Sequence, residues 1–239
     1  MRYLVLSDLH ANWEALQAVL ADAHGDYDQV LCCGDLAGYG PDPNPVIDWV
    51  RTAVGPVVRG NHDRACCGLE DMEWFNPVAR AANLWTAAQL TEGNLTYLRS
   101  LPCGPLTVQG FQIAHGSPTD ENEYLMSLAD AAEALSKLET NLAFFGHTHM
   151  QGAFMWMHGR FGAVAGPRLR LEPDAAWLIN PGAVGQPRDG DPRAAYSLYD
   201  TDLNEVVQCR VSYDYETTAR KIIAAGLPDV LAARLALGK

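Results

Sequence analysis

Five short apolar segments of this chain each run directly into aspartate, asparagine or histidine. Segments of this length, bounded by polar residues, are predicted to be buried strands. The polar residues that follow them are, in chain order, Asp8 and His10, Asp35, Asn61 and His62, His115, and His147 and His149. In sheets that alternate with helices, sites form outside the carboxyl ends of the strands. We therefore expect these side chains to converge on one crevice.

Helical periodicity and capping residues alternate with strands in the first part of the chain. Helices are predicted over 12–23, from an N-cap at Asn44 to about 53, from an N-cap at Asn76 to 90, over 91–100, and from Ser127 to about 139. The tail over 215–237 is also predicted to be helical, with a break near 226–228.

Strands dominate the later part of the chain. They are predicted in 2–8, 29–33 and 56–63, around a tight turn at Gln109–Gly110, and in 141–145, 152–157, 175–180, 194–200 and 205–211. This order favours two packed sheets with helices outside, which is an α/β fold, or α+β in some schemes. We expect a single domain over residues 1–239, with a helical tail over about 214–239.

Composition limits the partners of the chain. Its residues are 48% hydrophobic and 19% charged, which is typical of a globular protein, and its net charge is −12. An acidic chain has no general attraction for nucleic-acid polymers or anionic membranes, so neither is expected as a partner. The six cysteines form no C-x-x-C, which favours buried thiols in a reducing compartment. Without a signal peptide or a membrane-spanning run, the expected location is the cytoplasm.

Each strand-end motif alone has a simpler explanation. Asp8 could open a helix, Asp35 could bond to its own backbone in a turn, and His115 could be a solvated loop residue. His147 and His149 are more specific, because two imidazoles two positions apart can point the same way from a strand end. Their joint occurrence, in order and each after a strand, argues against these separate explanations.

Together these side chains form an oxygen and nitrogen ligand set without thiolate. Two aspartates, one asparagine and four histidines suit a pair of ions such as Mn²⁺, Fe, Zn²⁺, Co²⁺ or Ni²⁺. Two ions about 3.5–4 Å apart can clamp the attacking and leaving oxygens of an in-line displacement. One carboxylate must bridge them, and a water between them would lose a proton near neutral pH.

The ordered motifs resemble the calcineurin-like metallophosphoesterase superfamily. They are D-x-H at 8–10, G-D at 34–35, G-N-H-D at 60–63, the histidine of H-G-S-P at 115, and G-H-x-H at 146–149. The stretch 180–196 is similar to the small single-domain bacterial and archaeal branch of phosphodiesterase type. The resemblance implies a four-layer αββα sandwich, in which two packed mixed β-sheets are flanked by helices.

The resemblance also implies a role for each motif. Asp8, His10 and His149 would bind one metal, Asp35 would bridge, and Asn61, His115 and His147 would bind the second. Mn²⁺ is the expected ion in vitro. A metal-bridging hydroxide would attack the phosphorus without a phosphoenzyme. His62 would bind no metal and would protonate the leaving oxygen, which suits a group whose pKa lies near the working pH.

One position departs from the family pattern. Many relatives carry an acidic or amide residue three positions after the bridging aspartate, where this chain has Gly38. That departure weakens the analogy to Ser/Thr protein phosphatases. We expect Asp63 to orient His62 instead, and we include it with His62 as a catalytic residue.

Candidate substrate contacts lie close to these motifs. Arg64 and Arg188 could bind phosphate through a bidentate guanidinium, whereas Arg193 is expected to be a surface charge. Asn12 and Tyr39 follow metal-bearing strand ends. Trp74, Phe75 and Trp85 could stack on a nucleobase, although buried aromatic residues in helices are commoner.

The resulting prediction is a two-metal hydrolase of a small phosphoester, with phosphodiesters preferred and nucleotides among the substrates considered. The alternatives are a phosphomonoesterase, a dinucleoside polyphosphate hydrolase, or a scaffold member of the fold with little catalysis. The complete ligand set together with His62 argues against the scaffold. The sequence makes no prediction about oligomeric state.

Overall fold

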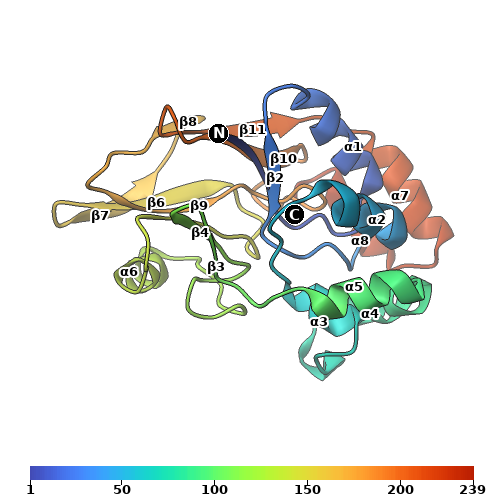
Figure 1. The fold of residues 1–239 in the computed structure, drawn as a ribbon. Coiled ribbons are helices and arrows are strands. Elements are labelled where there is room, and N and C mark those ends of the chain that lie inside the picture. Colours follow the sequence, from blue (N-terminus) through green and yellow to red (C-terminus); the bar gives the residue numbers. More distant parts are fainter.

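Two β-sheets lie face to face, with helices on their outer sides (Figure 1). The structure is a computed structural model and describes residues 1–239. The first sheet contains, in spatial order, β2 (Gln29–Cys32), β1 (Arg2–Leu6), β10 (Ala194–Asp200), β11 (Glu205–Val211) and β8 (Arg168–Arg170). Strand β1 pairs parallel to β2 and antiparallel to β10, so this sheet is mixed.

The second sheet has six strands and is also mixed. It contains, in spatial order, β3 (Leu106–Val108), β4 (Phe111–Ile113), β5 (Leu142–Phe144), β9 (Ala176–Asn180), β6 (Gly152–Met157) and β7 (Arg160–Val164). Strands β4, β5 and β9 are parallel neighbours, and the other pairs are antiparallel. The predicted turn at Gln109–Gly110 is confirmed, and positive φ angles of 44° and 96° suit a tight hairpin.

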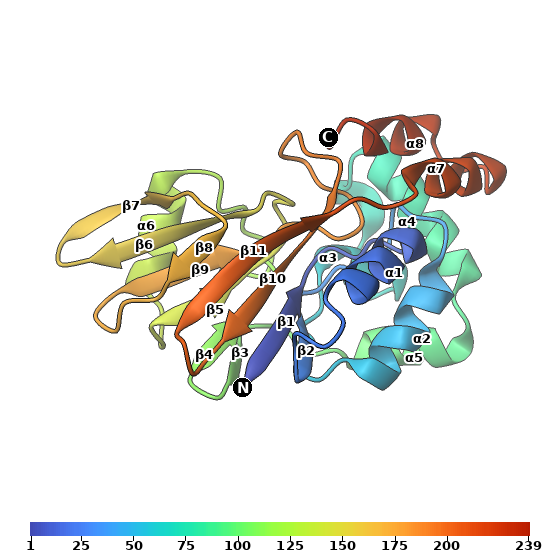
Figure 2. The same cartoon turned by 90° about the horizontal axis from the view of Figure 1, so that it is seen from above.

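Most helices lie on the side of the first sheet, while one helix covers the second (Figure 2). They are α1 (Trp13–Asp22), α2 (Pro43–Ala53), α3 (Asn61–Cys66), the short 3₁₀ helix η1 (Met72–Trp74), α4 (Pro77–Gln89), α5 (Glu92–Ser100), α6 (Leu128–Ser136), α7 (Tyr215–Ala224) and α8 (Asp229–Leu235). Helix α6 covers the second sheet. None of the helices is long and apolar enough to cross a bilayer.

Apolar clusters fill the spaces between four layers. Leu4 and Leu6 of β1 pack against the helices, whereas Tyr3 and Val5 of the same strand point into the space between the sheets. This alternation is the period of two expected for a buried strand. A further cluster joins the second sheet to α6. The predicted four-layer αββα sandwich of two mixed sheets flanked by helices is therefore confirmed.

Three local predictions need correction. The segment 56–63 forms only a single bridge, from Val57 to Cys32, because the chain turns at once into α3. Helix α2 begins after Asp42, so Asn44 is not its N-cap. The Asn44 side chain instead bonds to the carbonyl of Gln89 and the N–H of Thr91, which ties α2 to the α4–α5 junction. Helix α6 ends at residue 136 rather than near 139.

Candidate metal centre

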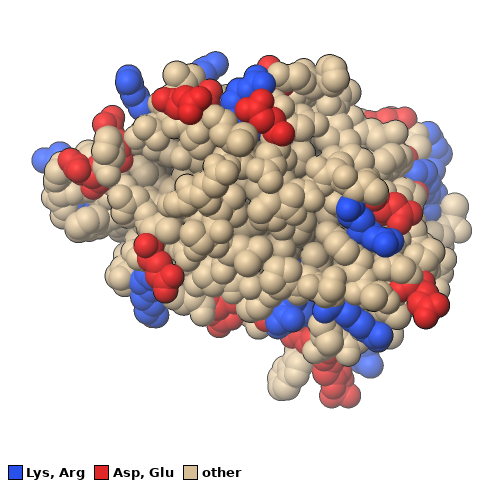
Figure 3. All heavy atoms as spheres, viewed as in Figure 1, with Lys and Arg blue, Asp and Glu red and all other residues tan.

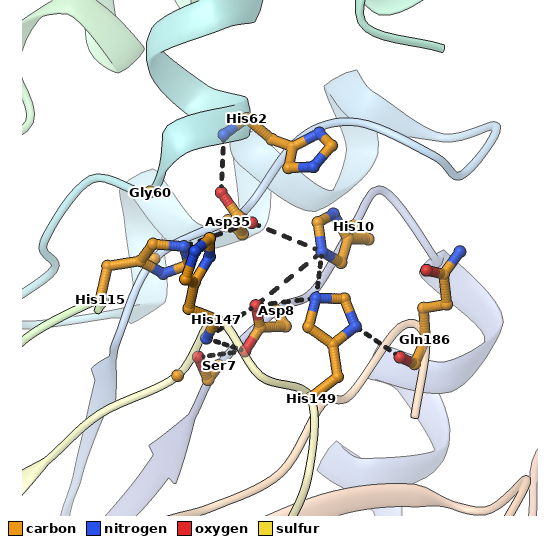
Figure 4. Close-up of polar contacts among 12 residues, drawn as sticks. Ser7, Asp8, His10, Asp35, Gly60, His62, His115, His147, His149 and Gln186 are labelled. Carbon is orange, nitrogen blue, oxygen red and sulfur yellow. Dashed lines mark hydrogen bonds and ion pairs between the residues drawn. The ribbon is translucent and has the colours of Figure 1, made fainter. Parts of the chain in front are cut away.

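Six of the seven predicted ligands lie together where strands of both sheets end (Figure 4), and Oδ1 of the seventh, Asn61, lies 3.1 Å from Nε2 of His115. Asp8 follows β1 and Asp35 follows β2, while His115 follows β4 and both His147 and His149 follow β5. Each of these side chains is at most 4% exposed. These polar side chains, each after a strand end, therefore converge on one place, as the sequence led us to expect.

Unusual backbone geometry aims these ligands inward. Asp8, His10, Asp35, His147 and His149 all have φ between 43° and 66°, in the left-handed region. Residues other than glycine rarely adopt this region, and where they do they cluster at functional sites. Sharp turns after β1, β2 and β5 thus bring side chains from three strand ends to one point.

A first group of possible ligands combines Asp8, His10, Asp35 and His149. One ligand atom from each lies within 4.8 Å of every other. Nε2 of His149 is 3.2 Å from a carboxylate oxygen of Asp8, and Nε2 of His10 is 3.5 Å from Oδ2 of Asp35. The geometry suits one ion held by two carboxylates and two imidazoles.

A second group combines Asp35, His115 and His147. Nε2 of His115 is 3.4 Å from Oδ2 of Asp35 and 3.1 Å from Oδ1 of Asn61. Asp35 belongs to both groups, and its Oδ2 faces His10 on one side and His115 on the other. Burial would raise the pKa of Asp35, but the neighbouring histidines, His115 first, hold it well below its usual value.

The histidine tautomers show that these residues fit metal ions. Nδ1 of His10, His115 and His149 lies 2.6–2.9 Å from a backbone carbonyl oxygen. Each Nδ1 must therefore carry a proton and donate it, so in the neutral imidazole the lone pair is on Nε2. Nε2 of His10 and Nε2 of His149 are 3.0 Å apart. Two facing lone pairs repel each other unless a cation lies between them.

Unsatisfied buried atoms support the same conclusion. Oδ2 of Asp35 and Nε2 of His147 are buried and have no hydrogen-bond partner. Buried polar atoms nearly always have partners, and metal ions would supply them here. Burial and the neighbouring His115 lower the pKa of His147 to about 3, so its imidazole is neutral and can coordinate. Burial lowers the pKa of His115, but the Asp35 carboxylate outweighs this and raises it to about 9. The second group thus attracts positive charge.

His62 sits beside both groups. Its backbone N–H donates to Oδ1 of Asp35 at 2.9 Å, while its ring lies edge-on to His10 at 4.9 Å between centroids. Nδ1 of His62 is 2.7 Å from Oδ1 of Asn83, which is fully buried in α4. Sequence reasoning missed Asn83, because nothing in its local pattern distinguishes it from other helix residues.

Asp63 does not have the predicted role. Its carboxylate accepts the backbone N–H groups of Leu36, Ala37 and Gly60 and has no contact with the His62 ring. The Asp63 carboxylate therefore stabilises the turn that carries Asp35. Asn83 is the residue that orients His62.

The space around Gly38 is too small for the polar side chain that the family pattern would place there. A Cβ there would lie 2.5 Å from Nδ1 of His62 and 2.8 Å from Oδ1 of Asn83. The His62–Asn83 hydrogen bond occupies the space that a side chain at position 38 would need.

Replacing Asn83 by leucine is expected to lower kcat roughly 10–100-fold, as losses of outer hydrogen-bond partners do at metal sites. The buried bond that fixes the His62 tautomer is lost, so the ¹⁵N signals of that ring should also change. Thr86→Val, a buried change on the same helix, is the matched control and should keep turnover. Normal kcat with unchanged His62 signals in Asn83→Leu would contradict this role.

Two of the four predicted substrate residues have structural roles instead. Asn12 is 1% exposed, caps α1, and donates to the carbonyl of Gly185. Arg64 is held by Glu70 and Glu121, with side-chain oxygens 2.5–2.7 Å away, so its guanidinium is not free for phosphate. Local sequence could not show these partners, since Glu121 and Gly185 are distant in the chain.

The other two residues lie at the site. The Tyr39 ring is 4.7 Å from the His10 ring and 4.4 Å from that of His62, between centroids. The guanidinium carbon of Arg188 lies 5.5 Å from the centre of the Tyr39 ring. Both positions allow a contact with substrate.

A cavity of about 270 Å³ opens over the metal centre. Asn61, His62 and His147 line its inner part. Its more exposed outer wall includes Trp74, Phe75 and Tyr124, and the buried Tyr39 also lines the cavity. Trp74 is 89% exposed rather than buried. Trp85, in contrast, packs with the C-terminal helices and does not line the cavity.

Comparison with known proteins decides the family. The sequence model of the calcineurin-like phosphoesterase superfamily domain matches residues 1–204. The chain belongs to this superfamily. It is thus a metal-dependent phosphoesterase, and the buried Asp and His groups are its candidate metal ligands.

Similar proteins cover this phosphoesterase from end to end. The crystal structure of a metallophosphoesterase from Sphaerobacter thermophilus is 40% identical, with a TM-score of 0.88, and the match covers 100% of this chain and 99% of that chain. Uncharacterized protein MJ0912 of Methanocaldococcus jannaschii is 33% identical over 98% of this chain and 97% of its own length. Hypothetical protein PH1004 from Pyrococcus horikoshii OT3, 20% identical with a TM-score of 0.80 over 100% and 98% of the two chains, shares the fold.

Proposed function

We propose that this phosphoesterase hydrolyses phosphodiesters with two divalent metal ions, and that His62 is its general acid. One observation carries the proposal. Two buried ligand groups share Asp35, while the His62 ring beside them contacts neither the Asp8 nor the Asp35 carboxylate. Asp8, His10, Asp35 and His149 would hold one ion, and Asp35, Asn61, His115 and His147 the other. Bound ions supply Lewis acidity and lower the pKa of water towards neutrality.

The chain's own residues position and transfer the proton. Asn83 accepts a hydrogen bond from Nδ1 of His62, so that nitrogen keeps its proton. Nε2 of His62 has no protein partner, and the residue lines the cavity. Burial lowers the pKa of His62, so Nε2 must first take up a second proton from solvent. It is then the nitrogen that gives this proton to the leaving oxygen as the phosphorus–oxygen bond breaks. Arg188 can balance the charge of the phosphate.

The outer cavity wall favours a diester. A phosphodiester carries a second organic group, and the rings of Trp74, Phe75 and Tyr124 offer it an apolar surface next to the metal centre. Tyr124 already lies over the His147 ring, 3.7 Å between centroids. A phosphomonoester with a small alcohol would leave most of this wall in water.

Replacing Trp74 by alanine is expected to raise KM for bis-p-nitrophenyl phosphate roughly 3–10-fold, the effect of losing one aromatic pair. The free energy of unfolding should change little, because the side chain is 89% exposed. The control is Trp156→Ala, which removes a half-exposed tryptophan from β6 outside the cavity. Equal KM values for both variants and the wild type would contradict a role for Trp74 in binding.

The proposed function is tested by measuring metal content and hydrolysis on the same purified protein. Bis-p-nitrophenyl phosphate and p-nitrophenyl phosphate are compared with Mn²⁺ added and with chelator present. We expect about two ions per chain and Mn²⁺-dependent turnover that is faster for the diester. Faster turnover of the monoester would contradict the diester preference. Two bound ions without turnover of either substrate would contradict the proposal for these substrates and favour a scaffold.

A further inference from the structure

Two arginines beside the metal centre pair with no aspartate or glutamate side chain. Arg2, Arg59, Arg64 and Arg210 are also partly buried, and each of these pairs with an aspartate or glutamate. Arg188 and Arg234 are the only partly buried arginines that do not. Arg188 donates to Oε1 of Gln186 at 2.9 Å, while its buried Nε has no partner. Arg234 donates from Nε to the main-chain oxygen of Lys239.

These two arginines meet at Tyr39. The guanidinium carbon of Arg188 lies 5.5 Å from the centre of the Tyr39 ring, and that of Arg234 lies 5.9 Å from it. The same ring contacts His62 at 4.4 Å between centroids. Both positive charges therefore lie one aromatic ring away from the proposed general acid.

The end of the chain holds Arg234 in this position. The N–H of Gly190 donates to the carbonyl of Gly238 at 3.0 Å, so the C-terminal residues lie against the loop that carries Arg188 (Figure 2). A Cβ at Gly238 would lie 2.7 Å from the backbone of Asp191, which shows how closely the two segments approach. Helix α8 lies outside residues 1–204, the part matched by the superfamily.

Two like charges close together at a partly buried position repel each other. Burial first, and then the charge of Arg188, lower the pKa of Arg234. The chain as a whole carries a charge of −12, and acidic and basic side chains are interspersed on the face in Figure 3. Arg188 and Arg234 are thus a local concentration of positive charge in an acidic protein. Guanidinium groups bind oxyanions such as phosphate in a bidentate manner.

We propose that Arg188 and Arg234 form a subsite for a second phosphate group of the substrate. This rests on the proposed function, because the reacting phosphate is taken to lie at the metal centre. The substrate class is then a phosphodiester whose organic part carries a further phosphate. In this proposal Arg188 contacts both the reacting phosphate and the second one, whereas Arg234 contacts the second one alone.

Binding is tested first on the metal-free protein, without turnover. Inorganic phosphate is titrated while the arginine Nε–H signals are followed by NMR and assigned through single variants. We expect shifts at Arg188 and Arg234, and a Kd raised about tenfold or more in Arg234→Gln. Arg170→Gln, an exposed arginine on β8, is the matched control and should bind like the wild type. Absence of shifts at both arginines, or an unchanged Kd in Arg234→Gln, overturns the proposal.

A kinetic comparison then separates the two phosphates. The probes are thymidine 5′-(p-nitrophenyl phosphate) and the same compound with a 3′-phosphate. Arg234→Gln should lose about tenfold more kcat/KM on the compound with the extra phosphate. An equal loss on both compounds overturns the proposal, since Arg234 would then serve the reacting phosphate. If the wild type hydrolyses neither compound, the proposed function fails for them and the binding measurement alone decides the subsite.

Discussion

Replacing Asp35 by asparagine is expected to lower the metal content below one ion per chain and to reduce turnover roughly 10³-fold or more. Asp35 is the one carboxylate shared by both ligand groups, and its Oδ2 lies within 3.5 Å of Nε2 of His10 and of His115. Asparagine removes the negative charge and turns one of the two oxygens into an N–H donor. Both ion positions therefore weaken together.

Metal analysis by mass spectrometry and hydrolysis of bis-p-nitrophenyl phosphate measure this effect. The matched control is Asp174→Asn, which changes an exposed aspartate without a hydrogen-bond partner. It should keep both ions and full turnover. An Asp35→Asn variant that retains two ions and wild-type turnover would show that Asp35 does not bridge.

Replacing His62 by alanine is expected to reduce turnover roughly 10²–10⁴-fold while both metal ions remain bound. The imidazole bonds only to Asn83, so no ligand is removed. The backbone N–H that donates to Oδ1 of Asp35 is also kept in alanine. The loss should therefore fall on proton donation alone.

Substrates with different leaving groups distinguish a loss of proton donation from a general disruption of the site. p-Nitrophenolate leaves readily without a proton, whereas an alkoxide needs one. His62→Ala should therefore lose more activity on an alkyl diester than on bis-p-nitrophenyl phosphate. Loss of metal in this variant, or full activity on both substrates, would contradict the role of His62 as general acid.

The position of the candidate ligands could be predicted because it depends on a local sequence pattern, a short apolar run followed by a polar residue. Each apolar run is short enough to be one strand, so the next polar residue must lie at the sheet edge. Asp8 after β1 and His115 after β4 show this directly. Helix starts with a clear capping residue were equally predictable, such as Asn76, whose side chain accepts the N–H groups of Val78 and Ala79. Where a second proline-flanked residue competed, at Asn44, the prediction was wrong.

Contacts between distant segments could not be predicted in this way. Asn83 reaches His62 only because α4 packs beside α3, and Arg234 reaches Tyr39 only because α8 folds back over the site. Asp63 is adjacent to His62 in sequence, yet in a helix adjacent residues face different directions. The structure directs its carboxylate to the turn at Leu36 instead.

The central claim is that two ions share Asp35, and anomalous diffraction from Mn²⁺-soaked crystals tests it most directly. We expect two peaks about 3.5–4 Å apart, one among Asp8, His10 and His149 and the other among Asn61, His115 and His147, with Asp35 between them. A single peak, or peaks that do not contact Asp35, would contradict the two-metal centre.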